Sequence, residues 1–359
     1  MASERIPELD GLRGLAILAV LIFHLSPANI PLFAAYFVQA GWLGVDLFFV
    51  LSGYLITGLL LDSAGRPGYY RNFIARRTLR IFPLYYVCLI LACIIDFGPW
   101  PIQWKDFTIA GNWWYAGFLR NFQVALRNYW PSGVMTPLWS LQVEEQFYLT
   151  FPFLVAVLPR KALARVLIAS VFAALMLRVG LLLARPANIT GTYVLMPCRM
   201  DSLAMGSLIA IGRRDFPETL RGRWVGFVTV VSAAVVAWIC WKYGPSPWSR
   251  AMRTAGFSAA DIAFTGVLVL LIVQRRPFLI LLCRMRVLVW IGTISYGLYL
   301  LHGPVMELVH RALPLLRISA GGPGESLLSL AVSLAAAWAS SVFFESPILR
   351  LRERLTARG

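Results

Sequence analysis

Ten long apolar segments follow one another along the chain and constrain its fold more than any other feature. Each is close to the roughly 20 residues that an α-helix needs to cross a bilayer. Their expected spans are 11–26, 38–61, 79–96, 138–158, 163–184, 192–212, 224–242, 256–274, 287–310 and 325–347. Hydrophobic residues make up 59% of the sequence and charged residues 14%, a composition that excludes a soluble domain. The sequence therefore predicts an all-α, polytopic membrane protein with about ten transmembrane helices.

The basic residues predict the orientation of these helices. The formal net charge is +16, yet the sequence contains no motif or basic stripe typical of a nucleic-acid-binding protein. Most arginines instead fall in alternate connections, and cytoplasmic connections are the ones rich in Lys and Arg. We therefore expect cytoplasmic N- and C-termini and a single membrane domain over residues 1–359, with no appended soluble domain. The five cysteines form no CxxC pair, so we expect no metal site.

The first apolar segment carries a row of ionisable side chains. Arg13 and His24 are eleven residues apart, so on a helix they share a face and lie about 16 Å apart along its axis. Asp10 lies three residues before Arg13 on that face, where it is a better partner for Arg13 than a catalyst. Ionisable residues inside a membrane usually mark a functional site. The alternative for His24 is a buried histidine that is hydrogen-bonded to a neighbouring helix.

Arginines gather where the third segment begins. Arg76, Arg77 and Arg80 lie at its expected cytoplasmic mouth. Guanidinium groups bind phosphate oxygens bidentately and remain charged, so the three are candidates for a phosphate clamp. Arg76 and Arg80 are four residues apart and share a helix face. The alternative is that they only anchor the helix at the cytoplasmic surface.

A second polar row opens the fourth segment. Ser140, Glu144 and Tyr148 recur every four residues, which places them along one face of a helix. Glu144 is a candidate to bind an acceptor hydroxyl or to orient His24. The alternative is that Ser140 and Glu144 serve the helix N-terminus, as a cap and as an acidic residue that complements the helix dipole. In the second segment, we expect Asp46 to face the same cavity. There, Ser52 and Gly53 are expected to permit close helix approach rather than to supply a nucleophile.

These motifs together, in their order along the chain, resemble the acyltransferase-3 family of membrane O-acyltransferases. The resemblance covers nearly the whole chain and includes two further motifs near its end. The matching stretches are 8–13 with His24, 44–53, 76–83, 140–148, 294–302 and 343–347. The resemblance implies transfer of an acyl group, expected to be acetyl, from acyl-CoA to a hydroxyl of a carbohydrate, glycolipid or small molecule. It also implies a multi-pass protein of the bacterial inner membrane.

The resemblance assigns roles to the polar residues. It implicates His24, whose ordinary pKa of about 6.5 suits a general base that takes a proton from a hydroxyl and returns it to a thiolate. An acyl-histidine intermediate remains open. The arginines would hold coenzyme A in the cytoplasm, while the pantetheine arm carries the thioester towards His24. His302, in the motif 294–302, is expected to be structural or to lie on the acceptor side.

The connection over 97–137 is rich in aromatic residues, among them Trp113 and Trp114. Flat aromatic faces suit sugar rings, so these two tryptophans are candidates for a glycan platform. The alternative is an aromatic belt at the membrane interface.

For the chain as a whole, the main rival function is a transporter of a sugar or another polar solute, because polar residues inside helices also serve a solute pathway. A structural or sensory membrane protein is the third possibility, and it would not need His24 or the arginines.

Overall fold

The computed structural model describes residues 6–26, 32–97, 109–130, 134–315 and 322–350. Within these residues the fold is a bundle of helices without strands. Its long helices are α1 (Pro7–Leu25), α3 (Gly44–Ser63), α4 (Tyr69–Phe97), α7 (Trp139–Val157), α8 (Arg160–Ala184), α10 (Met196–Asp215), α12 (Trp224–Tyr243), α13 (Phe257–Ile272), α16 (Ser295–Leu315) and α17 (Pro323–Ala339). Each of the ten predicted apolar segments coincides with one of them, which confirms the all-α prediction.

Shorter elements complete the fold and mostly connect the long helices. They are α2 (Leu32–Gln39), η1 (Ala40–Leu43), α5 (Ile109–Ala116), α6 (Arg120–Arg127), η2 (Thr136–Leu138), α9 (Gly191–Val194), α11 (Pro217–Arg221), α14 (Pro277–Cys283) and α15 (Arg286–Thr293), with π-helical turns at η3 (Met252–Gly256) and η4 (Ser340–Glu345). Helix α15 meets α16 at a bend of 74°.

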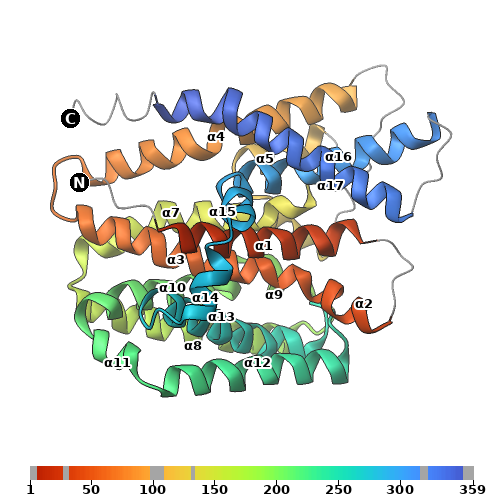
Figure 1. The fold of residues 1–359 in the computed structure, drawn as a ribbon. Coiled ribbons are helices and arrows are strands. Elements are labelled where there is room, and N and C mark those ends of the chain that lie inside the picture. Colours follow the sequence, from red (N-terminus) through yellow and green to blue (C-terminus); the bar gives the residue numbers. More distant parts are fainter. Residues whose placement is uncertain (1–5, 27–31, 98–108, 131–133, 316–321, 351–359) are drawn as a thin grey trace.

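Six of the described helices are long and apolar enough to cross a membrane, or seven if the bent pair of α15 and α16 is one span. Helix α1, which carries the ionisable row, is not among the six. The polytopic membrane class is therefore supported, while the number of ten crossings stays a prediction. The start of α1 and the end of the helix that continues α17 lie at the same end of the bundle (Figure 1). The assignment of that end to the cytoplasm stays a prediction.

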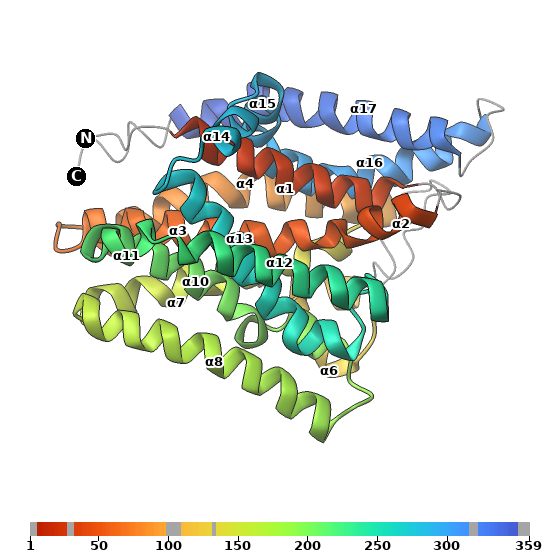
Figure 2. The same cartoon turned by 60° about the horizontal axis from the view of Figure 1, so that its bottom comes forward.

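Close backbone contact sets the centre of the bundle. A Cβ on Gly53 of α3 would overlap the carbonyl oxygen of Leu203 on α10, and a Cβ on Gly206 would overlap the carbonyl of Val50. The two helices therefore pack backbone to backbone, as expected for Gly53, because small residues let membrane helices approach closely. Helices α8 and α17 lie on opposite edges of the bundle (Figure 2), and most of their side chains face outward.

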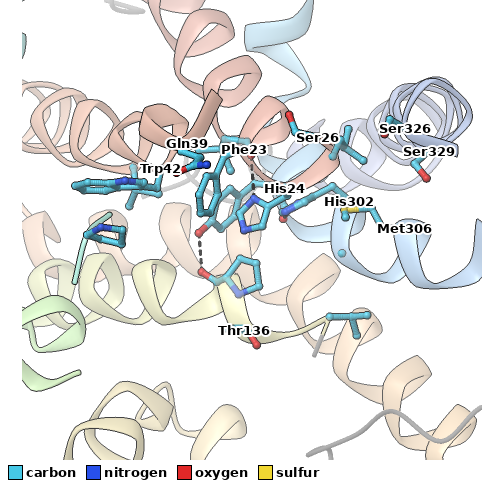
Figure 3. A pocket seen from close by; sticks show the side chains of 18 of the residues that line it. Phe23, His24, Ser26, Gln39, Trp42, Thr136, His302, Met306, Ser326 and Ser329 are labelled. Carbon is cyan, nitrogen blue, oxygen red and sulfur yellow. Dashed lines mark hydrogen bonds between the residues drawn. The ribbon is translucent and has the colours of Figure 1, made fainter. Parts of the chain in front are cut away.

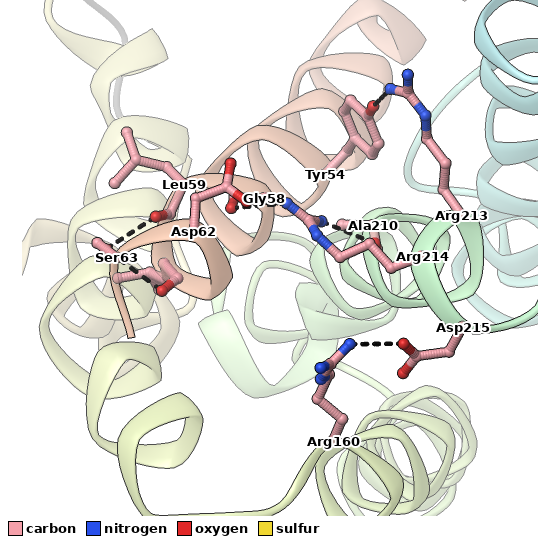
Figure 4. Close-up of polar contacts among 11 residues, drawn as sticks. Tyr54, Gly58, Leu59, Asp62, Ser63, Arg160, Ala210, Arg213, Arg214 and Asp215 are labelled. Atoms are coloured by element: carbon pink, nitrogen blue, oxygen red, sulfur yellow. Dashed lines mark hydrogen bonds and ion pairs between the residues drawn. The ribbon is translucent and has the colours of Figure 1, made fainter. Parts of the chain in front are cut away.

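Ion pairs tie three helices together at one end of the bundle (Figure 4). The Arg214 guanidinium lies 2.6 Å from Asp62, which joins α10 to α3, and Arg160 lies 2.6 Å from Asp215, which joins α8 to α10. Arg213 also donates to the hydroxyl of Tyr54 on α3. The arginines of both pairs are well exposed, so each pair is expected to stabilise the fold by less than about 1 kcal/mol.

Candidate functional site

Two histidines that are distant in sequence line a large cavity among the described residues. This cavity, here the histidine cavity, has a volume of about 840 Å³ and lies where α1 ends against α16 and α17. His24, near the end of α1, and His302 of α16 lie side by side in it (Figure 3). Their ring centroids are 5.1 Å apart. The structure thus places His302 beside His24, a proximity that the sequence did not predict.

Hydrogen bonds to backbone carbonyls orient both imidazoles. Nδ1 of His24 lies 2.9 Å from the carbonyl oxygen of Val20, and Nδ1 of His302 lies 2.7 Å from that of Tyr299. A carbonyl oxygen only accepts, so each neutral ring carries its proton on Nδ1 and leaves a lone pair on Nε2. His302 is fully buried, and its Nε2 has no hydrogen-bond partner among the described residues. In each ring, Nε2 is therefore the nitrogen that is not bonded to its own helix.

Arginines line the second cavity, here the arginine cavity, which has a volume of about 100 Å³. Arg13 of α1 and Arg77 and Arg80 of α4 meet there. Arg13 also pairs with Asp10 at 3.7 Å, as the sequence predicted. The guanidinium of Arg77 lies 5.1 Å from the centre of the Tyr148 ring, close enough for a cation–π interaction. The result is a narrow, positively charged site inside the helix bundle.

Glu144 shares the arginine cavity with Ser52 and Tyr148. The Ser52 hydroxyl donates a hydrogen bond to Glu144 and lies 3.3 Å from the Tyr148 hydroxyl. The expectation that Glu144 orients His24 is wrong, because Glu144 does not line the histidine cavity and His24 is bonded to Val20 instead. Ser52 was expected only to permit helix packing, and its contact with Glu144 was missed because α3 and α7 are far apart in sequence.

The two cavities meet at Val45 and Tyr299, which line both. The Tyr299 hydroxyl donates to the carbonyl of Pro137 at 2.6 Å. The Ser140 hydroxyl lies 2.6 Å from the Tyr299 hydroxyl. Ser140 also lines the arginine cavity. The alternative role of Ser140 as a helix cap is not observed, because α7 begins without a side-chain cap. Tyr299 therefore forms a wall between the arginines and the histidines.

Arg76 lies outside this arrangement, contrary to the sequence prediction. It is exposed and lines neither cavity, whereas Arg77 and Arg80, three residues apart, both line the arginine cavity. Residues three apart share a helix face as residues four apart do, so the spacing alone could not select the correct pair. The candidate clamp consists of Arg13, Arg77 and Arg80.

Asp46 also departs from expectation, because it lines neither cavity. It is fully buried in an ion pair with Arg199 of α10, whose guanidinium lies 4.2 Å from the centre of the Phe257 ring. A buried guanidinium inside a helix bundle needs a counter-charge, and Asp46 supplies it. Its role is therefore structural rather than substrate binding.

The two tryptophans of the predicted glycan platform lie outside both cavities, so the platform stays a prediction. Trp113 and Trp114 stack on each other at a centroid distance of 4.0 Å on α5, and neither lines a cavity. The aromatic wall of the histidine cavity comes instead from Trp42, Trp130, Trp139, Tyr193 and Trp248. Of these, only Trp130 belongs to the aromatic-rich connection over 97–137; the other four come from elsewhere in the sequence.

Comparisons with known proteins bear on these cavities. A family model for an acyltransferase domain matches residues 6–342. O-acetyltransferase OatA of Staphylococcus aureus is 30% identical over 336 residues, which cover 86% of this chain and 52% of the relative. Peptidoglycan O-acetyltransferase OatA of Listeria monocytogenes is 28% identical over 371 residues, which cover 97% of this chain and 56% of the relative. The putative peptidoglycan O-acetyltransferase YrhL of Bacillus subtilis is 28% identical over 331 residues, which cover 84% of this chain and 49% of the relative.

The chain spans about half the length of these curated relatives. No solved structure matches it. The family model nevertheless covers the described helices from α1 to α17, and with them both cavities. The chain therefore belongs to the acyltransferase-3 family, which its motifs resemble.

Proposed function

We propose that this protein is a membrane O-acetyltransferase that transfers acetyl from acetyl-CoA to a hydroxyl of a carbohydrate. The observation that carries the proposal is that the arginine and histidine cavities meet at Tyr299. A positively charged site for an anionic donor thus adjoins a site with two basic imidazoles. The names of the relatives, which describe O-acetyltransferases, support the same reaction. Membership of an acyltransferase family favours this function over a transporter or a sensor.

The donor would bind through its phosphates and its thin pantetheine arm. The arginine cavity, at about 100 Å³, is too small for a whole nucleotide. The nucleotide would therefore remain at the end of the bundle where α4 begins, which we expect to be cytoplasmic. Arg77 and Arg80, which line the cavity, would bind the phosphates nearest to it, because guanidinium groups form strong, charge-assisted bonds with phosphate oxygens. The thioester would then reach past Tyr299 to the histidine cavity.

His24 would act as the general base. Its Nε2 takes the proton of the acceptor hydroxyl while the hydroxyl oxygen attacks the thioester carbonyl. The new C–O bond forms and the C–S bond breaks, so the coenzyme A leaves as a thiolate. The protonated His24 then returns its proton to that sulfur, which leaves the histidine neutral for the next cycle. The bond between Nδ1 and Val20 keeps Nε2 available for both transfers.

The acceptor would enter the histidine cavity from the other end of the bundle, which we expect to face away from the cytoplasm. Peptidoglycan is the acceptor that the names of the Listeria and Bacillus relatives give, so a cell-wall or related surface glycan is the acceptor class proposed here. The bacterial cytoplasmic membrane is the corresponding location. The acetyl group would cross the membrane while the coenzyme A nucleotide stays on its own side.

Binding of acetyl-CoA to purified, detergent-solubilised protein tests the proposal. We expect saturable binding by the wild type and at least tenfold weaker binding by Arg77→Ala/Arg80→Ala, since each charged hydrogen bond contributes about 1.5–3 kcal/mol. Arg76→Ala is the matched control, because Arg76 is exposed and outside both cavities, and it should bind as the wild type does. A folded wild type that does not bind, or a double variant with unchanged affinity, would overturn the donor assignment.

A further inference from the structure

Charge is sorted between the two cavities. Three arginines line the arginine cavity, but no Lys or Arg occurs among the described residues that line the histidine cavity. This absence contrasts with the net charge of +16 of the whole chain. Apart from tyrosines, the ionisable side chains among the described residues that line the histidine cavity are His24, His302, Glu307, His310 and Glu325.

The two glutamates of the histidine cavity each have a partner on α16. His310 lies 2.8 Å from Glu325, and Arg311 lies 2.5 Å from Glu307. Arg311 does not itself line the cavity, so its charge is committed to Glu307 rather than presented to a ligand. An anionic group inside the cavity would lose water and meet carboxylates, and it would find no Lys or Arg among the described lining residues. The lining His310 is already bonded to Glu325. Such desolvation without a partner is strongly unfavourable.

One side of the histidine cavity is aromatic and the other is polar. Trp130 and Trp248 lie with ring centroids 4.9 Å apart, and both contact Tyr193 at 5.1–5.6 Å. Trp130 is 39% exposed, so part of its surface is available to a ligand. Figure 3 shows Trp42 on one side of the histidines and Ser326 and Ser329 of α17 on the other. Aromatic faces bind the apolar faces of sugar rings, while hydroxyl groups bind the edges.

We propose that the histidine cavity binds an uncharged stretch of oligosaccharide and discriminates against anionic glycans. The sugar faces lie against Trp130 and Trp248, and the hydroxyls reach the polar wall of α16 and α17. The volume of about 840 Å³ is near the upper end of the range for small-molecule sites, which suits more than one sugar ring. This inference rests on the proposed function in that it names the acceptor of the same site.

Calorimetric titration with a matched pair of saccharides tests the inference. The probes are the tetrasaccharide of N-acetylglucosamine and the same tetrasaccharide oxidised at its reducing end to a carboxylate. We expect the neutral probe to bind saturably and the carboxylate to bind at least tenfold more weakly. Trp130→Ala/Trp248→Ala should weaken the neutral probe at least tenfold. Trp241→Ala should not, because Trp241 is 74% exposed on α12 and outside the cavity.

A change of charge at Gln39 provides the second arm. Gln39 lines the histidine cavity and is exposed, so its replacement should not disturb folding. Gln39→Arg should strengthen binding of the carboxylate probe several-fold relative to the neutral probe, and Gln39→Glu should not. Equal or tighter binding of the carboxylate by the wild type would overturn the inference. So would failure of the neutral probe to bind protein that still binds acetyl-CoA.

The same samples separate this inference from the proposed function. Loss of acetyl-CoA binding with intact binding of the neutral saccharide would contradict the donor assignment and leave the saccharide site standing. Intact binding of acetyl-CoA without discrimination between the two saccharides would contradict the inference about the saccharide site and leave the donor assignment standing.

Discussion

The imidazole rings of His24 and His302 are 5.1 Å apart between centroids and tilted by 54° relative to each other. They come from α1 and α16, and each is bonded through Nδ1 to a carbonyl of its own helix. Nε2 is therefore the nitrogen of each ring that is not bonded to its own helix. Because the two histidines come from different helices, each can be replaced by itself and its role tested separately.

His24→Ala should abolish acetyl transfer while acetyl-CoA still binds. Loss of a general base typically lowers the rate by about 10²–10⁴-fold, and the arginine cavity does not include His24. The measurements are acetylation of a saccharide acceptor and calorimetric binding of acetyl-CoA by the same preparation. Near-normal transfer by the variant would exclude His24 as the base.

His302→Ala should lower kcat about tenfold and leave the KM for acetyl-CoA unchanged. Once His24 has taken up a proton, its Nε2–H needs an acceptor. The unpartnered Nε2 of His302 is a candidate for that acceptor. A hydrogen bond to a charged group contributes about 1.5–3 kcal/mol. His302→Gln retains a side-chain acceptor and should recover part of the rate. A purely structural role would instead lower the yield of folded protein and affect both variants alike.

Tyr299→Ala should increase the hydrolysis of acetyl-CoA in the absence of an acceptor. Tyr299 separates the two cavities and is held by Pro137 and Ser140, so its removal would let water reach the thioester. The measurement is release of free coenzyme A without saccharide. Tyr299→Phe keeps the ring and loses only the hydroxyl, and it should hydrolyse no faster than the wild type. An unchanged rate for Tyr299→Ala would show that Tyr299 does not exclude water.

The features that the sequence predicted correctly are local ones. Apolar runs of about 20 residues located every long helix, because burial in lipid requires a continuous apolar stretch. The pair of Asp10 and Arg13 was predictable because residues three apart are neighbours on a helix. The close approach at Gly53 was predictable because small residues allow it. Each of these inferences needs only one helix at a time.

The features that were missed depend on which helices become neighbours. Asp46 meets Arg199, Ser52 meets Glu144 and His24 meets His302 across 92 or more positions of sequence. A single sequence holds no direct record of such pairings. Trp113 and Trp114 were singled out from an aromatic-rich connection, whereas the cavity wall is assembled from residues that meet only in the folded bundle.

Asp46→Ala should destabilise the protein without a specific effect on donor affinity. The change removes the carboxylate that is paired directly with the buried Arg199, and breaking a buried pair on one side costs about 3–5 kcal/mol. Asp62→Ala is the matched control, because it removes one partner of the exposed pair with Arg214 and should cost less than about 1 kcal/mol. Thermal unfolding of both variants in the same detergent provides the comparison.

Asp46→Leu/Arg199→Met, which removes both charges, should recover much of the lost stability. The same preparation should bind acetyl-CoA with wild-type affinity. A stable Asp46→Ala variant that binds acetyl-CoA poorly would return Asp46 to the substrate site.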